Sequence, residues 1–201
     1  MAVDRVRFFE RVRKNPCGGR LYGAQVTGME AILDHWDLHS KAADPALAYV
    51  LATAFHETAK TMQPVRETLA KSDAQAVARL ERAYASGRLP SVKTPYWRPD
   101  ADGKTWLGRG FVQLTHKRNY EAMSDLTGED LVADPALAMR IDIAARILIE
   151  GMRVGIFTGW RLEFFFGRDK TDWVGARKIV NGTDRAELVA GYGRAFAAAL
   201  S

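Results

Sequence analysis

The stretch AFHETAKTMQPVRE, residues 54–67, places two carboxylates, Glu57 and Glu67, ten residues apart. The residues before it predict a helix that begins at Asp44-Pro45, because aspartate can cap free N–H groups and proline suits the first helical position. Pro64 then ends regular helix before Glu67. We therefore expect the first carboxylate at the end of a helix and the second beyond a proline turn.

Four residues of this helix recur at the spacing of one helix face and predict a buried stripe: Leu47, Leu51, Ala54 and Thr58. Glu57 falls at the edge of the stripe, where apolar surroundings disfavour an ionised carboxylate and suit a general acid. Glu67 lies beside Arg66, in a polar neighbourhood that favours the ionised form. Glycoside hydrolysis uses such a pair, one carboxyl to protonate the leaving oxygen and one to activate water or attack carbon. The alternative is that both are solvated glutamates, which are common on helices.

The composition is that of an ordinary globular chain. At 201 residues, with 47% hydrophobic and 26% charged residues, the chain suits one domain with a single core. The only cysteine, Cys17, excludes an intrachain disulfide and points to folding in a reducing cytosol. Neither the first residues nor any later run is apolar enough for a signal peptide or a membrane span, so we expect neither.

The net charge is +5, from 29 Lys and Arg against 24 Asp and Glu. A basic chain suits a polyanionic partner such as nucleic acid, a membrane surface or an anionic cell wall. The basic residues are scattered without a recognition motif, so we expect no nucleic-acid partner. Residues 3–14 form an amphipathic basic segment with Val6, Phe9 and Val12 as its apolar side. We expect this segment to pack on the core, with binding at a membrane surface as the alternative.

Periodicity and start signals predict a mainly helical chain. Further helices are expected over residues 25–39, 72–84, 134–154, 172–180 and 184–200. Ser72 would cap the second of these, Asp134-Pro135 would open the longest, and Asp184 would cap the last.

A short strand is expected in the run GRGFVQLT, residues 108–115. Glycines flank Arg109 and let the backbone pass close to another surface. Phe111 to Thr115 then alternates like a strand, which puts Gln113 and Thr115 on one face, where they can line a cleft.

Trp97 and Trp106 lie in an irregular stretch, residues 95–106. Aromatic rings with polar tips in a loop suit stacking on the apolar faces of sugar rings, and a loop satellite of the core explains them equally well.

His35 and His39 stand four residues apart on a predicted helix, a spacing that can hold a metal when other ligands converge. The chain has four histidines and one cysteine and shows no further ligand cluster in its sequence. We expect no metal site and no cofactor.

Several motifs occur in one order: HET at residues 56–58, Glu67, GRGFVQLT at 108–115, Asn119-Tyr120, and VNG at 180–182. With them the chain resembles glycoside hydrolase family 19, and most of all the phage endolysins of that family, whose fold belongs to the lysozyme superfamily. The resemblance runs from about residue 25 to the C-terminus, and GRGFVQLT is its most specific part. It implies a mainly α, lysozyme-like domain of two lobes, a small β element beside a sugar cleft, and an inverting mechanism.

By position, the resemblance implies that Glu57 is the general acid, that Glu67 is the base, and that Thr115 helps to hold the attacking water. Residues assigned to substrate binding are Gln113, Asn119 and Asn181, which would bind acetamido sugars, and His56, Trp97, Trp106, Arg109 and Tyr120. The segment between the two glutamates is much shorter than in plant chitinases of the family. The disulfides of the plant members are also missing, which fits an intracellular phage product.

We therefore expect an endolysin, used for host cell lysis, that hydrolyses the β-1,4 bond between N-acetylmuramic acid and N-acetylglucosamine in peptidoglycan glycan strands. Residues 1–201 would form one monomeric catalytic domain, with the N-terminal helices of residues 1–40 packed on it and no separate wall-binding domain. The protein would be made in the cytoplasm of the bacterial host and reach the wall after another protein permeabilises the membrane. The alternatives are a chitinase, a lytic transglycosylase that needs only one carboxylate, and a non-catalytic glycan-binding protein, against which the presence of both carboxylates counts.

Overall fold

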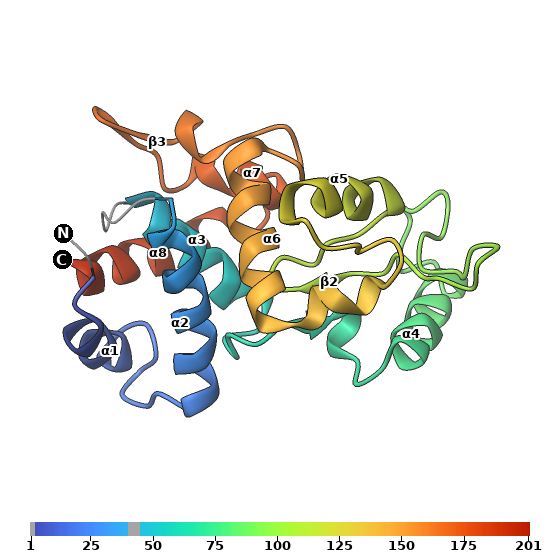
Figure 1. Ribbon diagram of the computed structural model, residues 1–201, viewed down its shortest axis with the longest axis horizontal. Coiled ribbons are helices and arrows are strands. Elements are labelled where there is room, and N and C mark those ends of the chain that lie inside the picture. Colours follow the sequence, from blue (N-terminus) through green and yellow to red (C-terminus); the bar gives the residue numbers. More distant parts are fainter. Residues whose placement is uncertain (1–2, 40–44) are drawn as a thin grey trace.

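The computed structural model describes residues 3–39 and 45–201 (Figure 1). Within these ranges the chain is mainly helical, as predicted, and forms eight α-helices: α1 (Arg5–Lys14), α2 (Gly23–Asp37), α3 (Pro45–Glu57), α4 (Asp73–Ala85), α5 (Lys117–Thr127), α6 (Ile141–Val154), α7 (Lys178–Asn181) and α8 (Ala186–Leu200). Four short strands form two antiparallel pairs: β1 (Val65–Arg66) with β2 (Arg109–Gly110), and β3 (Phe166–Gly167) with β4 (Lys170–Thr171). The 3-10 turns are η1 (Glu67–Leu69), η2 (Pro135–Met139), η3 (Leu162–Phe164) and η4 (Gly175–Arg177). The expected cap Asp44 lies outside the described residues.

Helix α3 is the buried centre of the larger core. Every residue from Leu47 to Phe55 is buried, so the helix has apolar neighbours on all sides and not only along the predicted stripe. Its main partner is α8, and α2 and α6 also pack against it. The ring of Phe55 meets Tyr192 and Phe196 of α8 edge-on, with centroids 5.0 Å and 5.8 Å apart. Burial of this kind, and not helix propensity, is what stabilises most helices in proteins.

Helix α1 packs on the core, as expected. Phe8 and Val12 are buried against α8, and Arg11 donates to the carbonyl oxygen of Ala198 at 3.1 Å. The predicted apolar side was partly wrong, because Val6 is 73% exposed and Phe8 takes the inward position. Arg5 forms ion pairs with acidic residues of α2, which fixes α1 on that helix.

The predicted helix over residues 134–154 is broken. Residues 135–139 form a 3-10 turn, and Arg140 is extended, with φ −70° and ψ 133°, before α6 begins at Ile141. Asp134 does cap the first turn, since its side chain accepts from the N–H of Ala136. The turn lies against β2, and a Cβ on Gly110 of that strand would stand 3.0 Å from the carbonyl oxygen of Ala138. A straight helix from residue 134 would lose this packing.

The predicted strand over residues 111–115 is also wrong. Arg109 and Leu114 exchange backbone hydrogen bonds of 3.2 Å and 2.9 Å, so the residues between them form a tight turn. Gln113 has a φ of 57°, and Phe111, Val112 and Leu114 are all buried. A positive φ and a chain that folds back within five residues exclude the extended backbone that a strand requires.

The predicted helix over residues 172–180 is reduced to η4 and the short α7, and the last helix begins two residues later than expected. Its N-cap is Arg185, in a left-handed conformation without a side-chain cap. Asp184 instead offers its carbonyl oxygen to the Nε of Arg177 at 2.8 Å. By contrast, the cap by Ser72 is confirmed, because its side chain accepts from the N–H of Gln75.

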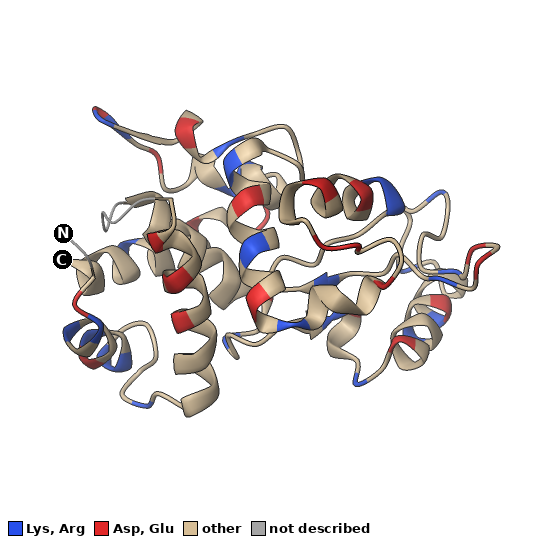
Figure 2. Ribbon diagram, in the orientation of Figure 1, with Lys and Arg blue, Asp and Glu red and all other residues tan. Residues whose placement is uncertain are grey.

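Figure 1 shows α1, α2, α3 and α8 gathered at one end of the molecule, α4 at the other end, and α6 between them. A second, smaller hydrophobic cluster lies at the α4 end and contains Ala70, Ala76, Leu80, Trp97 and Leu107. Figure 2 shows Lys and Arg on most elements, interspersed with Asp and Glu, with several on α1. Among the described residues, no helix combines the length and the apolar character needed to cross a membrane.

Residues 58–64 connect α3 to β1 and are fastened to α2. Ala59, Lys60 and Met62 all have positive φ angles, which are costly for residues other than glycine. The side chain of Gln25 donates to the carbonyl oxygen of Lys60 at 2.9 Å, and Met62 is fully buried. Gly28 of α2 lies so close that an added Cβ would stand 1.7 Å from the carbonyl oxygen of Met62. Contact with α2 therefore sets the path of this connector.

We expect Gly28→Ala to destabilise the protein, although the same change inside an exposed helix is worth up to about 1 kcal/mol in the opposite direction. The new methyl group overlaps backbone that cannot turn away, and overpacking of this kind costs about 1 to 3 kcal/mol. Thermal unfolding should show a Tm lower by roughly 2 to 12 °C. Gly191→Ala is the matched control, because nothing lies within 4 Å of a Cβ there. If both variants raise Tm, the contact with Met62 does not constrain the connector.

Candidate active site

Glu57 is the last residue of α3 and pairs with an arginine from a distant part of the chain. Its Oε1 accepts from Nη1 of Arg177 at 2.6 Å, and the side chains of Arg177 and Glu57 are 2% and 17% exposed. Glu57 does lie at the edge of the core, as predicted, but it meets a buried guanidinium there and not the purely apolar surroundings that were expected. Arg177 was not predicted as the partner of Glu57, because 120 positions separate the two residues. Among the described residues, no hydrogen bond reaches the second oxygen of Glu57.

Glu67 follows β1 directly and is hydrogen-bonded to Gly108, the residue before β2. Its backbone N–H donates to the carbonyl oxygen of Gly108 at 2.7 Å, and the N–H of Gly108 donates to Oε2 of Glu67 at 2.8 Å. The other carboxylate oxygen, Oε1, accepts from the hydroxyl of Tyr96 at 2.6 Å. Both oxygens are thus held, and each keeps lone-pair capacity for a water molecule.

Tyr96 and His116 extend this site toward a cavity of about 370 Å³, which they line together with residues 91–94. Burial and the Glu67 carboxylate raise the pKa of the Tyr96 hydroxyl, so it stays a hydrogen-bond donor near neutral pH. The ring of His116 lies 4.5 Å from that of Tyr96, and burial, helped by Arg118, lowers its pKa. Neither residue was singled out from the sequence.

Gln113, Thr115 and Asn119 are only partly buried, so their side chains remain near the surface. Gln113 donates from Nε2 to the carbonyl oxygen of Val65 at 3.0 Å, which ties the turn to β1 beside Glu67. Asn119 donates from Nδ2 to the carbonyl oxygen of Thr115 at 2.9 Å. The fold therefore places the run of residues 108–115 next to Glu67, although by a turn and not by the predicted strand.

Arg109 and Tyr120 do not lie on a surface where they could hold a sugar. They are 1% and 0% exposed. The guanidinium of Arg109 donates to Oδ2 of Asp73 at 2.5 Å and to the hydroxyl of Tyr120 at 2.8 Å. That hydroxyl donates in turn to the carbonyl oxygen of Leu107 at 2.8 Å. Their assignment to substrate binding is corrected, since a buried charge needs such partners and these residues supply the framework of the site.

Trp97 and Trp106 are buried, which favours a structural role in the core over the alternative of stacking on sugar rings. Trp97 is 0% and Trp106 is 5% exposed. Their indole N–H groups donate to carboxylates of Glu81 at 2.7 Å and Asp100 at 3.0 Å. A ring with no exposed face cannot stack on a glycan.

His56 and Asn181 differ in their surroundings. His56 is half-buried, and burial lowers the pKa of its ring although the adjacent Glu57 opposes the shift. Asn181 is exposed at the end of α7, four residues after Arg177, so it lies on the segment that carries the partner of Glu57.

A larger cavity, of about 690 Å³, lies elsewhere and includes neither glutamate. Its lining comes from the segment after α1, from the start of α2 and from the connector, with Cys17, Tyr22, Phe55 and Lys60 among the residues. This cavity therefore lies apart from the two carboxylates that the sequence analysis singled out.

A scan against protein-family models finds no family that matches the chain, and a search of curated proteins finds no relative.

Proposed function

We propose that this protein is a glycoside hydrolase that cleaves the β-1,4 bond between N-acetylmuramic acid and N-acetylglucosamine in peptidoglycan. The main support is the pairing of Glu67 with Gly108, which brings the second carboxylate to the most specific motif of the sequence. The resemblance to glycoside hydrolase family 19 extends the proposal to an inverting mechanism and a lysozyme-like fold of two lobes.

In this mechanism Glu57 is the general acid and Glu67 the general base. Glu57 has one oxygen paired with buried Arg177, which leaves its second oxygen to carry the proton for the leaving sugar. Each oxygen of Glu67 accepts one hydrogen bond and still has a lone pair to accept a proton from water. Thr115, partly exposed and adjacent to this segment, would help to hold that water.

The proposed setting is the lysis of a bacterial host by a phage. The protein would act as a monomer on glycan strands after another protein opens the membrane. A net charge of +5 favours approach to an anionic wall.

Mass spectrometry of the products from purified peptidoglycan tests the reaction. A new reducing end on muramic acid supports the proposal, and the same result on chitin oligomers would add chitin as a substrate. Anhydromuramic acid among the products would show that the protein is a transglycosylase and not a hydrolase. A reducing-end glucosamine would show that it cleaves the other glycosidic bond of the strand. Tight glycan binding without any product would show that the protein binds glycan strands but does not cleave them.

We expect Glu57→Gln to lower the rate of wall lysis by about 10²- to 10⁴-fold, the usual contribution of general acid–base catalysis. The amide keeps the size of the side chain and can still accept from Arg177 but cannot donate the proton. Lysis rate and Tm should be measured together with Glu121→Gln, a matched change on the exposed face of α5. Wild-type turnover by a folded Glu57→Gln variant would reject Glu57 as the acid.

Glu67→Gln separates hydrolysis from transglycosylation. An inverting enzyme needs a base to activate water, so kcat should also fall by about 10²- to 10⁴-fold. A transglycosylase needs no such base, and its variant would keep near-normal kcat and release anhydromuramic acid. Product analysis on the variant decides between these outcomes.

Tyr96→Phe should lower kcat by about 10- to 100-fold, because loss of one hydrogen bond to a charged group is worth about 1.5 to 3 kcal/mol and 1.4 kcal/mol is one decade of rate. KM should change little, since the hydroxyl orients Glu67 and does not hold the sugar. Tyr84→Phe is the control: its ring lies 5.8 Å from Trp97 in the same aromatic cluster. Equal kcat values for the two variants would show that the hydroxyl of Tyr96 does not orient Glu67 during the reaction.

A further inference from the structure

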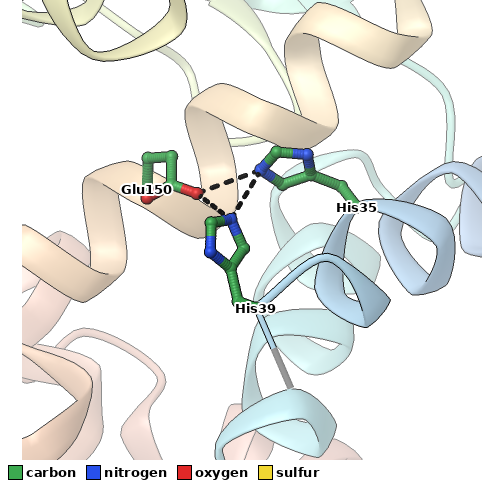
Figure 3. Close-up of side chains that lie close together, drawn as sticks. All are labelled: His35, His39 and Glu150. Carbon is green, nitrogen blue, oxygen red and sulfur yellow. Dashed lines mark hydrogen bonds and ion pairs between the residues drawn. The ribbon is translucent and has the colours of Figure 1, made fainter. Parts of the chain in front are cut away.

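Three side chains that the proposed hydrolysis does not use converge between α2 and α6 (Figure 3). His35 lies in the last turn of α2, His39 follows two residues after its end, and Glu150 lies on α6. One ligand atom from each, within the described residues, lies within 4.8 Å of the others. The sequence revealed only the histidine pair, because Glu150 is 115 positions from His35.

The cluster is not an ordinary set of solvated groups. The side chains of His35 and Glu150 are 13% and 12% exposed, and His39 is 31% exposed. Oε1 of Glu150 lies 3.0 Å from Nε2 of His35 and 2.5 Å from Nε2 of His39. Figure 3 shows the three side chains meeting, with His35 at the end of α2, His39 in the turn after it, and Glu150 on α6.

The spacing of these atoms is close to that of a metal shell. The two Nε2 atoms are 3.3 Å apart. Zinc bonds of about 2.0 to 2.1 Å in tetrahedral geometry put neighbouring ligand atoms roughly 3.3 to 3.4 Å apart. The distances to Glu150 are shorter because hydrogen bonds now join these groups, and a rotation of the carboxylate lengthens them.

Arg153 is the group that must move. Its Nη1 lies 3.0 Å from Nδ1 of His39 and 3.1 Å from Oε2 of Glu150. Because the guanidinium donates to Nδ1, the neutral ring of His39 carries its proton on Nε2. A metal ion at Nε2 needs the lone pair of that nitrogen, so the ring proton must move from Nε2 to Nδ1. Once protonated, Nδ1 can no longer accept a hydrogen bond from Arg153. The side chain of Arg153 is 43% exposed, so it can turn into solvent.

We propose that His35, His39 and Glu150 bind one divalent cation of the zinc class and thereby fasten the end of α2 to α6. Water completes the coordination shell. Two imidazoles and one carboxylate suit Zn²⁺ and its late first-row neighbours, whereas Mg²⁺ and Ca²⁺ prefer oxygen ligands alone. The proposal replaces the expectation of no metal site and is independent of the proposed hydrolysis.

Isothermal titration of chelator-treated protein with ZnCl₂, and Tm with and without Zn²⁺, test the site. We expect one Zn²⁺ per chain, no response to MgCl₂, and a Tm higher by about 5 to 10 °C when free Zn²⁺ is one hundred times its Kd. CoCl₂ should give a visible absorption band, which reports the ligands directly. No heat, no Tm change and no band would overturn the proposal.

Matched variants locate the ion. His39→Gln and Glu150→Gln should each raise Kd for Zn²⁺ at least tenfold and abolish the Co²⁺ band. His116→Gln, Glu121→Gln and Cys17→Ser should keep Kd within a factor of two, since these residues lie outside the cluster. Arg153→Gln should bind Zn²⁺ at least as tightly as the parent chain, because it removes a positive charge and a competing donor.

If His39→Gln and Glu150→Gln unfold, the Kd of Arg153→Gln for Zn²⁺ still tests whether the ion binds at this cluster. Tighter binding in this variant supports a site at Glu150. Binding that is lost in Cys17→Ser or His116→Gln, or that is unchanged in a folded Glu150→Gln variant, would place the metal elsewhere and reject this site.

Discussion

The arrangement around the second carboxylate depends on one buried positive charge. Arg109 is 1% exposed, and a guanidinium removed from water to this extent needs polar partners, which its Nη1 and Nη2 atoms find while its Nε has none among the described residues. Asp73 accepts from Arg109 of β2 and also, at 2.6 Å, from Arg66 of β1. Burial alone would raise the pKa of Asp73, but the hydrogen bonds from the two arginines outweigh it and lower that pKa. A single aspartate on α4 thus holds both strands, and the neighbours of the two arginines, Gly108 and Glu67, come into register as a result.

This framework explains why a motif of apparent substrate-binding residues is mostly buried. In the run of residues 108–115, Arg109, Phe111 and Leu114 point into the protein, and only Gln113 and Thr115 remain partly exposed. The motif shapes the surroundings of Glu67 more than it contacts a ligand. The first carboxylate is held in a different way, by a buried arginine near the C-terminal end of the chain. The two glutamates therefore depend on separate supports, joined by a connector that α2 fixes in place.

Local chemistry predicted the elements whose ends are set by near neighbours. Ser72 and Asp134 cap through bonds to residues two or three positions away, and such signals are visible in a sequence. The helix after Asp134 failed as a prediction because contact with β2 breaks it at Arg140, and the strand after Gly110 failed because Leu114 folds back on Arg109. Arg177 and Glu150 could not be found, since their partners lie more than one hundred positions away and no local pattern encodes such pairs. The positions of Glu57 and Glu67 were predictable because a helix end and a proline define them.

The packing of α1 against α8 has a consequence for the connectivity of the chain. The first and last helices touch, with Arg11 bonded to the carbonyl oxygen of Ala198, and Figure 1 shows α1 and α8, the helices nearest the two ends of the chain, at the same end of the molecule. A short peptide could join these ends, and new termini could be opened in the loop after α4, giving a circular permutant in which α3 is uncut. In such a rearranged chain Arg177 would precede Glu57, and their separation would fall from 120 positions to about 81 plus the joining peptide, without any change in the folded contact between them.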